Sequence, residues 1–319
     1  MGDNVSKRNL DAGETLDRQT PGSGWLAEAQ SPERDFAIDV RERFANRRLG
    51  EIMVMMGQIN QHDVDDVLEH QEELGLLFGE CCLHLKLIDE KNLSQALAWQ
   101  FGYVHPVSGS LSFGKDLVMV TDPFGPYAEA LRSISGTLMS RWVRAGRNVL
   151  PVTSAEPEDG RSHVAANLAV SFAQARRRTI LVDADLRKSR QHVIFDVPQH
   201  PGLSRLLCGF APKEVVRHFP SLKYLALIPS GPLPPNPLEL LSRDQLATFM
   251  KQAGEYYDVV VVDTPPSGSF ADAELIASAA GSALIVARRN QTHQRKVQDL
   301  AGRLKESGVQ IAGTVMNAY

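Results

Sequence analysis

The stretch Ile180-Leu181-Val182-Asp183-Ala184-Asp185-Leu186-Arg187 is the most informative part of this chain of 319 residues. Three apolar residues run directly into two carboxylates and an arginine, which is typical of a buried strand that ends at a functional edge. A second stretch of similar design, Val259-Val260-Val261-Val262-Asp263, is followed by Thr264-Pro265-Pro266. Strands this apolar favour a parallel sheet with helices on both faces.

Strands and helices alternate through the rest of the chain beyond residue 127. Strands are predicted at 148–153, 179–183, 222–229, 257–264, 283–288 and 310–316, and helices at 164–175, 238–253, 271–280 and 294–307. This alternation predicts the α/β fold class, a doubly wound parallel sheet whose ligands lie at the carboxyl ends of the strands.

The first predicted strand leads into a loop that ends in Glu158-Asp159-Gly160-Arg161-Ser162-His163. In a P-loop, backbone N–H groups surround phosphates at a helix N-terminus, a lysine neutralises them and a Ser or Thr hydroxyl holds magnesium. Gly160, Arg161 and Ser162 occupy the corresponding places, so we expect residues 158–163 to bind a nucleotide. An ordinary strand–turn–helix connection is the alternative for this loop alone.

Three strand ends therefore bring a hydroxyl, several carboxylates and a cation to one crevice. Phosphoryl transfer requires this set, because carboxylates position Mg²⁺ and activate a hydroxyl while positive charge stabilises the phosphates. The alternative is that Asp183 and Asp263 only cap turns.

The sequence at this point resembles a known family. Asp183, Asp185 and Arg187 resemble the Walker A′ motif of bacterial tyrosine kinases, and residues 260–266 resemble their Walker B motif. The proline-rich segment 230–241 is also similar to theirs. The resemblance covers about residues 127–319 and is closest to EpsG-type kinases of exopolysaccharide clusters. It implies a P-loop NTPase fold of the MinD-like (SIMIBI) type that uses ATP and Mg²⁺.

The resemblance also implies roles for individual residues. Ser162 and Asp183 would hold Mg²⁺ with support from Asp263, and Asp183, Asp185 and Arg161 would be catalytic. Glu129 and Arg132 resemble the start of an oligomerisation helix, or they form an exposed pair on that helix.

The chain departs from the family pattern in four places, one of which is His163, where a small hydroxyl residue is common. The family loop reads Gly-Glu-Gly-Lys-Ser or Gly-Glu-Gly-Arg-Ser, so Glu158 replaces a glycine and adds negative charge near ATP. Arg161 is a planar fork and does not reproduce a lysine. The tyrosine-rich tail of the family is reduced to Tyr319, which becomes the predicted phosphorylation site.

Three functions follow from the resemblance. The first is a tyrosine autokinase that regulates exopolysaccharide chain length and export, forms a homo-oligomer and works with a membrane-spanning co-polymerase. The second is a catalytically impaired, nucleotide-binding regulator of the same machinery. The third is a ParA/MinD-type positioning ATPase, although Glu156 stands where that group has its signature lysine.

An internal repeat precedes this region, since residues 49–71 match residues 78–100 with an offset of 29. Each copy predicts two short helices joined by a turn, and the two copies are expected to pack together. The pattern resembles the tandem motif of MshEN domains, which implies either cyclic di-GMP binding or protein docking. The candidate ligand residues are Arg48, Leu49, Gly50, Gln71, Phe78, Gly79 and Gln100. Leu77 and Lys86 replace the Arg and Gly of the motif in the second copy.

Composition completes the prediction. The 34 basic and 38 acidic residues give a net charge of −4, which argues against a nucleic acid polymer as partner. Because no secretory signal or apolar run of about 18 residues occurs, we expect a cytoplasmic protein that reaches the inner membrane through its partner. The three cysteines are expected to be buried free thiols.

The expected organisation has four parts: a disordered tail (1–41), an MshEN-like all-α domain (42–104), a linker (105–126) and a kinase-like domain (127–319). At most one short strand, at 116–120, is expected in the linker.

Overall fold

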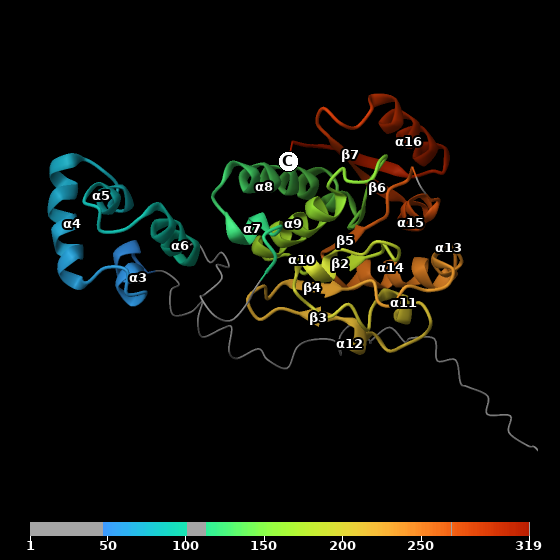
Figure 1. The fold of residues 1–319 in the computed structure, drawn as a ribbon, viewed down its shortest axis with the longest axis horizontal. Helices are drawn as coiled ribbons and strands as arrows, with labels where there is room; N and C mark the ends of the chain where they lie inside the picture. The colour runs from blue at the N-terminus through green and yellow to red at the C-terminus, as the bar shows by residue number, and fades with distance from the viewer. Residues whose placement is uncertain (1–46, 101–112, 269, 319) are drawn as a thin grey trace, which may run out of the picture.

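A computed structural model of the protein describes residues 47–100, 113–268 and 270–318. Figure 1 shows a helical unit (residues 47–100) and an α/β unit (residues 113–318) within this part of the chain. The predicted tail, the segment 101–112 and Tyr319 lie outside the described residues.

The α/β unit is built on one seven-stranded sheet with the order β3-β4-β2-β5-β1-β6-β7. Its strands are β1 (Val149–Ser154), β2 (Thr179–Asp183), β3 (Arg217–His218), β4 (Leu225–Ile228), β5 (Val259–Asp263), β6 (Ser282–Arg288) and β7 (Gln310–Asn317). All neighbouring strands pair in parallel except β3, which is antiparallel to β4 and was not predicted. The predicted α/β fold class, a doubly wound parallel sheet, is confirmed.

Helices cover both faces of this sheet. They are α7 (Val118–Thr121), α8 (Pro126–Arg141), α9 (Arg161–Gln174), α10 (Gln191–Ile194), α11 (Leu203–Leu206), α12 (Pro212–Val215), α13 (Pro237–Leu241), α14 (Asp244–Tyr256), α15 (Asp272–Ala280) and α16 (Gln294–Glu306), with the 3-10 turn η1 (Val143–Ala145) after α8. Alternate residues of β2 point to opposite faces: Leu181 packs in the cluster of α8 and α9, and Ile180 and Val182 in that of α14. Because both faces are apolar, the functional groups gather at the strand ends.

The predicted strand at 116–120 is wrong, because α7 occupies this segment. Met119 and Val120 are fully buried in the core beneath α8 and α9. Asn167 of α9 accepts a hydrogen bond from the Met119 N–H (3.0 Å) and donates one to the Asp116 carbonyl (2.8 Å). A short apolar run has no periodicity that would distinguish a helix from a strand. The hydrogen bonds of the buried Asn167 to the backbone of this segment stabilise the helical turn. Part of the expected linker therefore belongs to the core.

The helical unit contains α3 (Leu49–Met55), α4 (Gln61–Leu74), α5 (Phe78–His84) and α6 (Glu90–Gln100). The bounds of α3 and α5 differ by 29 residues at both ends, so the repeat seen in the sequence is a structural repeat. Helix α3 packs on α6 and α4 packs on α5, which means that each copy completes the core of the other.

Cys81 and Cys82 are free and buried in the core of the helical unit, as predicted, but Cys208 is exposed, so that part of the cysteine prediction is wrong. Over the residues that the structure covers, no helix has the length and apolar character needed to cross a membrane.

Candidate functional site

A cleft of about 690 Å³ lies at the carboxyl ends of β1, β2 and β5. One side is formed by the predicted phosphate loop, and another by the segment after β2. The remaining wall is apolar and contains Leu233, Pro234, Pro265 and Phe270. The structure therefore brings the predicted loop and the Asp185–Arg187 segment to one crevice.

The phosphate loop is held to the end of the sheet by its buried Asp159. The Asp159 carboxylate accepts hydrogen bonds from the Thr292 hydroxyl (2.6 Å) and the Glu156 N–H (3.1 Å). Asn317, at the end of β7, donates to the Asp159 carbonyl (3.1 Å). Gly160 has a φ of +89°, and a Cβ at this position would collide with Asn317. The loop conformation thus requires glycine immediately before α9.

Arg161, which takes the place of the P-loop lysine, is turned into the protein and is only 8% exposed. Its Nε donates to the Thr264 carbonyl (2.8 Å), and its Nη1 donates to Ser154 Oγ (2.8 Å) and the Glu156 carbonyl (3.2 Å). Its Nη2 lies 3.7 Å from Asp185 Oδ2. The donors of Arg161 are thus engaged by protein groups around the loop, and its catalytic and nucleotide-binding role stays a prediction.

Asp183 and Asp263 lie side by side, fully buried, at the ends of β2 and β5. Gln191 joins them, since its N–H donates to Asp183 Oδ2 (3.0 Å) and its Nε2 donates to Asp263 Oδ2 (2.8 Å). The same Nε2 lies 3.0 Å from the carbonyl oxygen of Ser162. Sequence reasoning did not assign Gln191 to the site, because nothing in the sequence shows that α10 turns back onto both strand ends.

Burial raises the pKa of both carboxyl groups. The pKa of Asp183 lies well above 3.8 because of burial and then the charge of Asp263. Burial raises the pKa of Asp263 to about 6, against the opposing effects of the Arg161 charge and the Gln191 hydrogen bond. Each carboxylate also keeps one buried oxygen, Oδ1, without a hydrogen bond.

Two buried, unsatisfied carboxylate oxygens fit a hard cation such as Mg²⁺, which prefers oxygen ligands. Among the described residues, no group of three or more His, Cys, Asp or Glu side chains is arranged to hold a metal. A Mg²⁺ ion here would rely on these carboxylates, the Ser162 hydroxyl and phosphate oxygens, which is the usual way this ion is bound.

The Asp185–Arg187 segment forms a tight turn beside the loop. Asp185 Oδ1 accepts hydrogen bonds from the N–H groups of Lys188 (2.8 Å) and Arg187 (3.2 Å). The Arg187 guanidinium pairs with Asp272 of α15 and lies over the ring of Phe270. Asp272 and Phe270 were not predicted as site residues.

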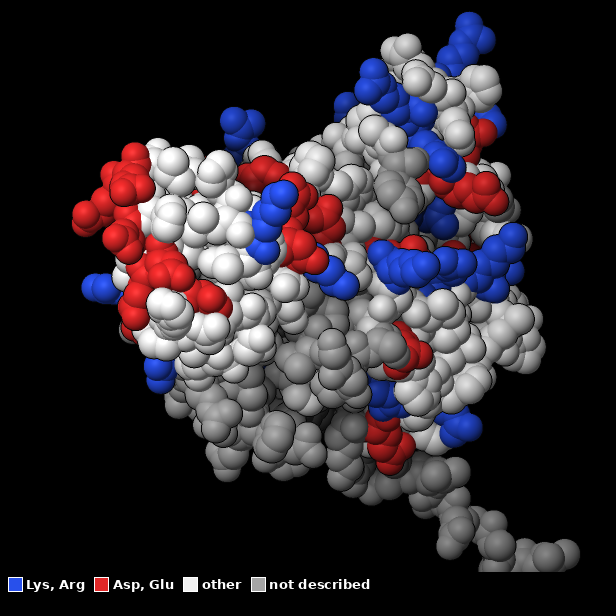
Figure 2. All heavy atoms as spheres, turned by 60° about the vertical axis from the view of Figure 1, so that its left-hand side comes forward, with Lys and Arg blue, Asp and Glu red and all other residues white. Residues whose placement is uncertain are grey.

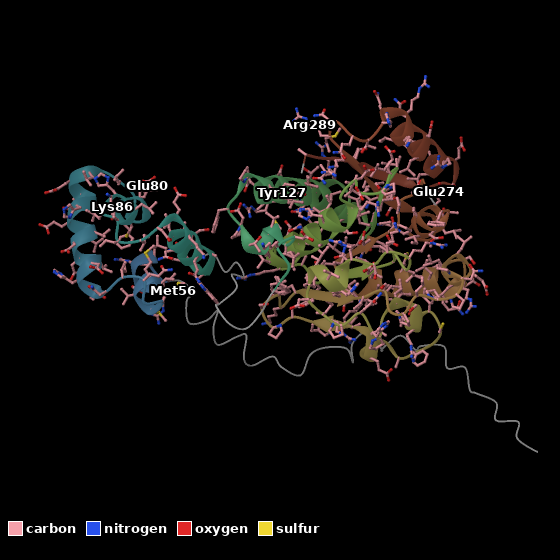
Figure 3. All side chains as sticks on the ribbon, viewed as in Figure 1. Met56, Glu80, Lys86, Tyr127, Glu274 and Arg289 are labelled. Carbon is pink, nitrogen blue, oxygen red and sulfur yellow. The ribbon has the colours of Figure 1, made fainter. Side chains whose placement is uncertain are left out.

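His163 lines the same cleft, with its ring centroid 5.3 Å from that of Tyr127, which Figure 3 labels. Burial lowers the pKa of His163. The ring is therefore largely neutral at neutral pH and adds no fixed charge to the nucleotide crevice.

The predicted oligomerisation pair lies on α8. Arg132 Nε donates to Glu129 Oε2 (2.9 Å), and Arg132 Nη1 donates to the Pro123 carbonyl (2.7 Å). Ser135, one turn further, points inward and bonds the Ser171 hydroxyl (2.8 Å). The pair stabilises the start of its own helix, and its role in assembly stays a prediction.

The candidate residues of the helical unit gather only in part. A Cβ on Gly50 would lie 2.9 Å from the Phe78 ring, and one on Gly79 would lie 3.5 Å from the Leu49 side chain. Gln100 Nε2 donates to the Arg47 carbonyl (3.3 Å), next to the exposed Arg48. In the second copy Leu77, the counterpart of Arg48, is 70% exposed.

Known proteins resemble this chain over its larger part. Tyrosine-protein kinase Etk of Escherichia coli K12 is 34% identical over 199 residues, which cover 62% of this chain and 27% of Etk. "Putative tyrosine-protein kinase CapB" of Staphylococcus aureus is 31% identical over 195 residues, which cover 61% of this chain and 86% of CapB. The chain thus spans about a quarter of the length of Etk and most of the length of CapB.

Solved structures agree with these relatives. The kinase domain of E. coli Etk superposes with a TM-score of 0.63 at 32% identity and covers 67% of this chain and 84% of that one. The chimerical protein CapA2B2 superposes with a TM-score of 0.60 at 31% identity, and the match covers 70% of this chain and 98% of that one. No protein-family model matches the chain.

Proposed function

The chain belongs to the family of bacterial tyrosine-protein kinases, and we propose that it is itself an ATP-dependent protein-tyrosine kinase. The observation that carries this proposal is the pair of buried carboxylates, Asp183 and Asp263, each with an unsatisfied oxygen beside the start of α9. Two adjacent carboxylates are costly to bury without a cation, which supports a site built for Mg²⁺ and phosphate.

The nucleotide phosphates would lie against Gly160 and the N-terminus of α9, where N–H groups and the helix dipole favour negative charge. Ser162 and Asp183 would hold Mg²⁺, with Asp263 in support. The bound ion supplies neutralisation of phosphate charge. Glu158, Asp159 and His163 complete the binding loop on this proposal.

In the transfer step, the tyrosine hydroxyl oxygen forms a bond to the γ-phosphorus of ATP, and the bond from that phosphorus to the bridging oxygen of ADP breaks. The hydroxyl proton passes to a carboxylate of the Asp183–Asp185 segment.

Radiolabelled ATP tests the kinase. The purified chain should incorporate label on tyrosine with Mg²⁺, and Asp183→Asn should reduce incorporation about 100-fold or more. Asp258→Asn is the matched control, since Asp258 lies just before β5, at the end of that strand remote from the crevice, and pairs there with Arg178. Absence of incorporation, with wild type equal to Asp183→Asn, would overturn the kinase proposal.

We further propose an EpsG-type role in exopolysaccharide chain length and export, as a homo-oligomer recruited to the inner membrane by a membrane-spanning co-polymerase. The support is the motif resemblance in residues 127–319. Co-purification with the product of a neighbouring chain-length-determinant gene tests this role, and a neighbourhood of partition or division genes would contradict it.

A nucleotide-binding regulator without turnover is the second candidate, favoured by two features of the loop. Glu158 takes a glycine-like backbone with φ +65°, and the donors of Arg161 are engaged inside the protein. Mg-ADP binding without any incorporation of label would select this candidate.

We propose that the helical unit is MshEN-like and that it docks onto another protein. Binding of cyclic di-GMP is the alternative. Leu77 leaves the second half without the arginine that stacks on and pairs with guanine and phosphate. Helix α4 carries six carboxylates and no Lys or Arg, and Figure 2 shows acidic side chains gathered on one side of the molecule. Calorimetry separates the two: heat from micromolar cyclic di-GMP would favour the alternative, and no heat would remove it.

A further inference from the structure

The crevice contains a second arginine, Arg187, whose guanidinium group is held at the cleft by a single carboxylate, whereas Arg161 is engaged by several protein groups. Arg187 Nε lies 2.6 Å from Asp272 Oδ2, and Arg187 Nη2 lies 3.3 Å from Asp272 Oδ1. The guanidinium carbon also lies 3.9 Å from the centre of the Phe270 ring. Two parallel hydrogen bonds and a ring below define both the position and the plane of this group.

The orientation leaves part of the guanidinium available. Both bonds to Asp272 use Nε and Nη2, and within the described residues Nη1 has no hydrogen bond to protein. Arg187 and Phe270 both line the cleft, together with Gly160 and Ser162 of the phosphate loop.

The other cations of the cleft are less suitable. Arg161 is engaged by three protein oxygens and Asp185, as described above. Arg190 is exposed and pairs with the exposed Asp116 at 3.5 Å. Lys188 is exposed, and its side chain would lose rotamer freedom on binding a phosphate. A side chain fixed before the ligand arrives avoids this entropic cost.

We propose that Arg187 contacts the terminal phosphate of the bound nucleoside triphosphate, and that Asp272 and Phe270 are the positioning residues that hold it there. This inference rests on the proposed nucleotide function. Arg187 takes the part that the P-loop lysine plays elsewhere, because Arg161 is occupied inside the protein.

The burial of Asp272 agrees with such a role. Its carboxylate is 1% exposed and lies in the first turn of α15, where the helix dipole and Arg187 stabilise it. Asp272→Asn keeps the shape of the side chain and removes the charge that orients the guanidinium. Glu274→Gln is the matched control, because Glu274 lies on the same helix and pairs with Arg303 (2.8 Å) away from the cleft.

The test compares the affinity of the full chain for Mg²⁺ with a non-hydrolysable ATP analogue and for Mg-ADP. Arg187→Ala should weaken binding of the analogue about tenfold or more while changing ADP affinity about threefold or less. Asp272→Asn and Phe270→Leu should also weaken binding of the analogue relative to binding of ADP, by smaller factors than Arg187→Ala. Arg187→Lys should keep only part of the wild-type preference for the ATP analogue over ADP. Glu274→Gln should leave both affinities unchanged.

A purely structural role would change both affinities together, because a distorted loop binds either nucleotide poorly. Equal losses for the two nucleotides, or none, in Arg187→Ala would overturn the inference while the proposed function stands. Wild-type protein that binds neither nucleotide would overturn both. Should Asp272→Asn fail to fold in a thermal unfolding check, the affinity ratios of Arg187→Lys and Phe270→Leu test the inference in its place.

Discussion

The helical unit and the crevice of the α/β unit place their acidic residues in opposite ways. Helix α4 carries its six carboxylates at or near the surface. Among the described residues, the five carboxylates that are buried all lie around the crevice: Asp159, Asp183, Asp185, Asp263 and Asp272. Burial of a carboxylate is costly unless it is paired or binds a cation, and Asp183 and Asp263 each keep an unsatisfied oxygen. We therefore expect these two residues to lower the stability of the ligand-free α/β unit, a cost that the exposed carboxylates of α4 do not have.

The two units also differ in the surroundings of a residue that replaces a glycine. Lys86 is the counterpart of Gly57 in the second repeat, and Glu158 stands where the family loop has glycine. Both replacements keep a glycine-like backbone, with φ of +57° for Lys86 and +65° for Glu158. Lys86, labelled in Figure 3, lies at an exposed turn, whereas Glu158 lines the cleft. We therefore expect the strained backbone to affect only stability at Lys86, and both stability and ligand binding at Glu158.

The largest effect is expected at Asp263. Because the pKa of Asp263 is about 6 in the folded protein and 3.8 ordinarily, the folded state binds the proton more tightly. The stability contributed by this group is complete below about pH 4 and is lost as the pH rises to about 6. Asp263→Asn should therefore raise the Tm of the ligand-free protein at pH 7.5. Each kcal/mol gained in the free energy of unfolding corresponds to about 2–4 °C in Tm.

The pH dependence provides the check on this prediction. The gain of Asp263→Asn over wild type should shrink between pH 7.5 and pH 5. Asp258 is the control with opposite sign, since hydrogen bonds from Arg178 lower its pKa despite partial burial. Asp258→Asn should reduce the Tm. A similar Tm for Asp263→Asn and wild type at every pH would show that burial of the Asp263 carboxylate does not destabilise the protein.

Glu158→Gly is expected to have an intermediate effect. It removes a negative charge from the phosphate site and relieves a positive φ, which should tighten Mg-ADP binding about tenfold and stabilise the fold by about 1 kcal/mol. Calorimetry with the nucleotide measures the first effect and denaturant unfolding the second. An unchanged affinity would mean that Glu158 does not impair the loop.

Lys86→Gly should give the smallest effect. Relief of the positive φ is partly offset by the greater entropy of glycine in the unfolded chain, so the gain should be at most about 1 kcal/mol. Nucleotide affinity should stay at the wild-type value. A change in nucleotide affinity would instead show that the helical unit and the nucleotide crevice are coupled.

The strands that carry the site could be predicted because their apolar runs end abruptly at carboxylates. Asp183 and Asp263 were identified in this way, and β2 and β5 end at these residues. The side-chain partners could not be predicted, because Gln191 and Asp272 reach the crevice only through the packing of α10 and α15. The inward turn of Arg161 likewise depends on the carbonyl of Thr264, which the sequence separates from it by 103 residues.

Calorimetry of Mg-ADP binding to the wild-type chain and to Ser162→Ala tests the nucleotide site most directly. We predict that the wild type binds Mg-ADP and that Ser162→Ala binds it at least about tenfold more weakly, because the hydroxyl proposed to hold Mg²⁺ is lost. Equal affinity of the two proteins for Mg-ADP, or no binding by the wild type, would contradict the account.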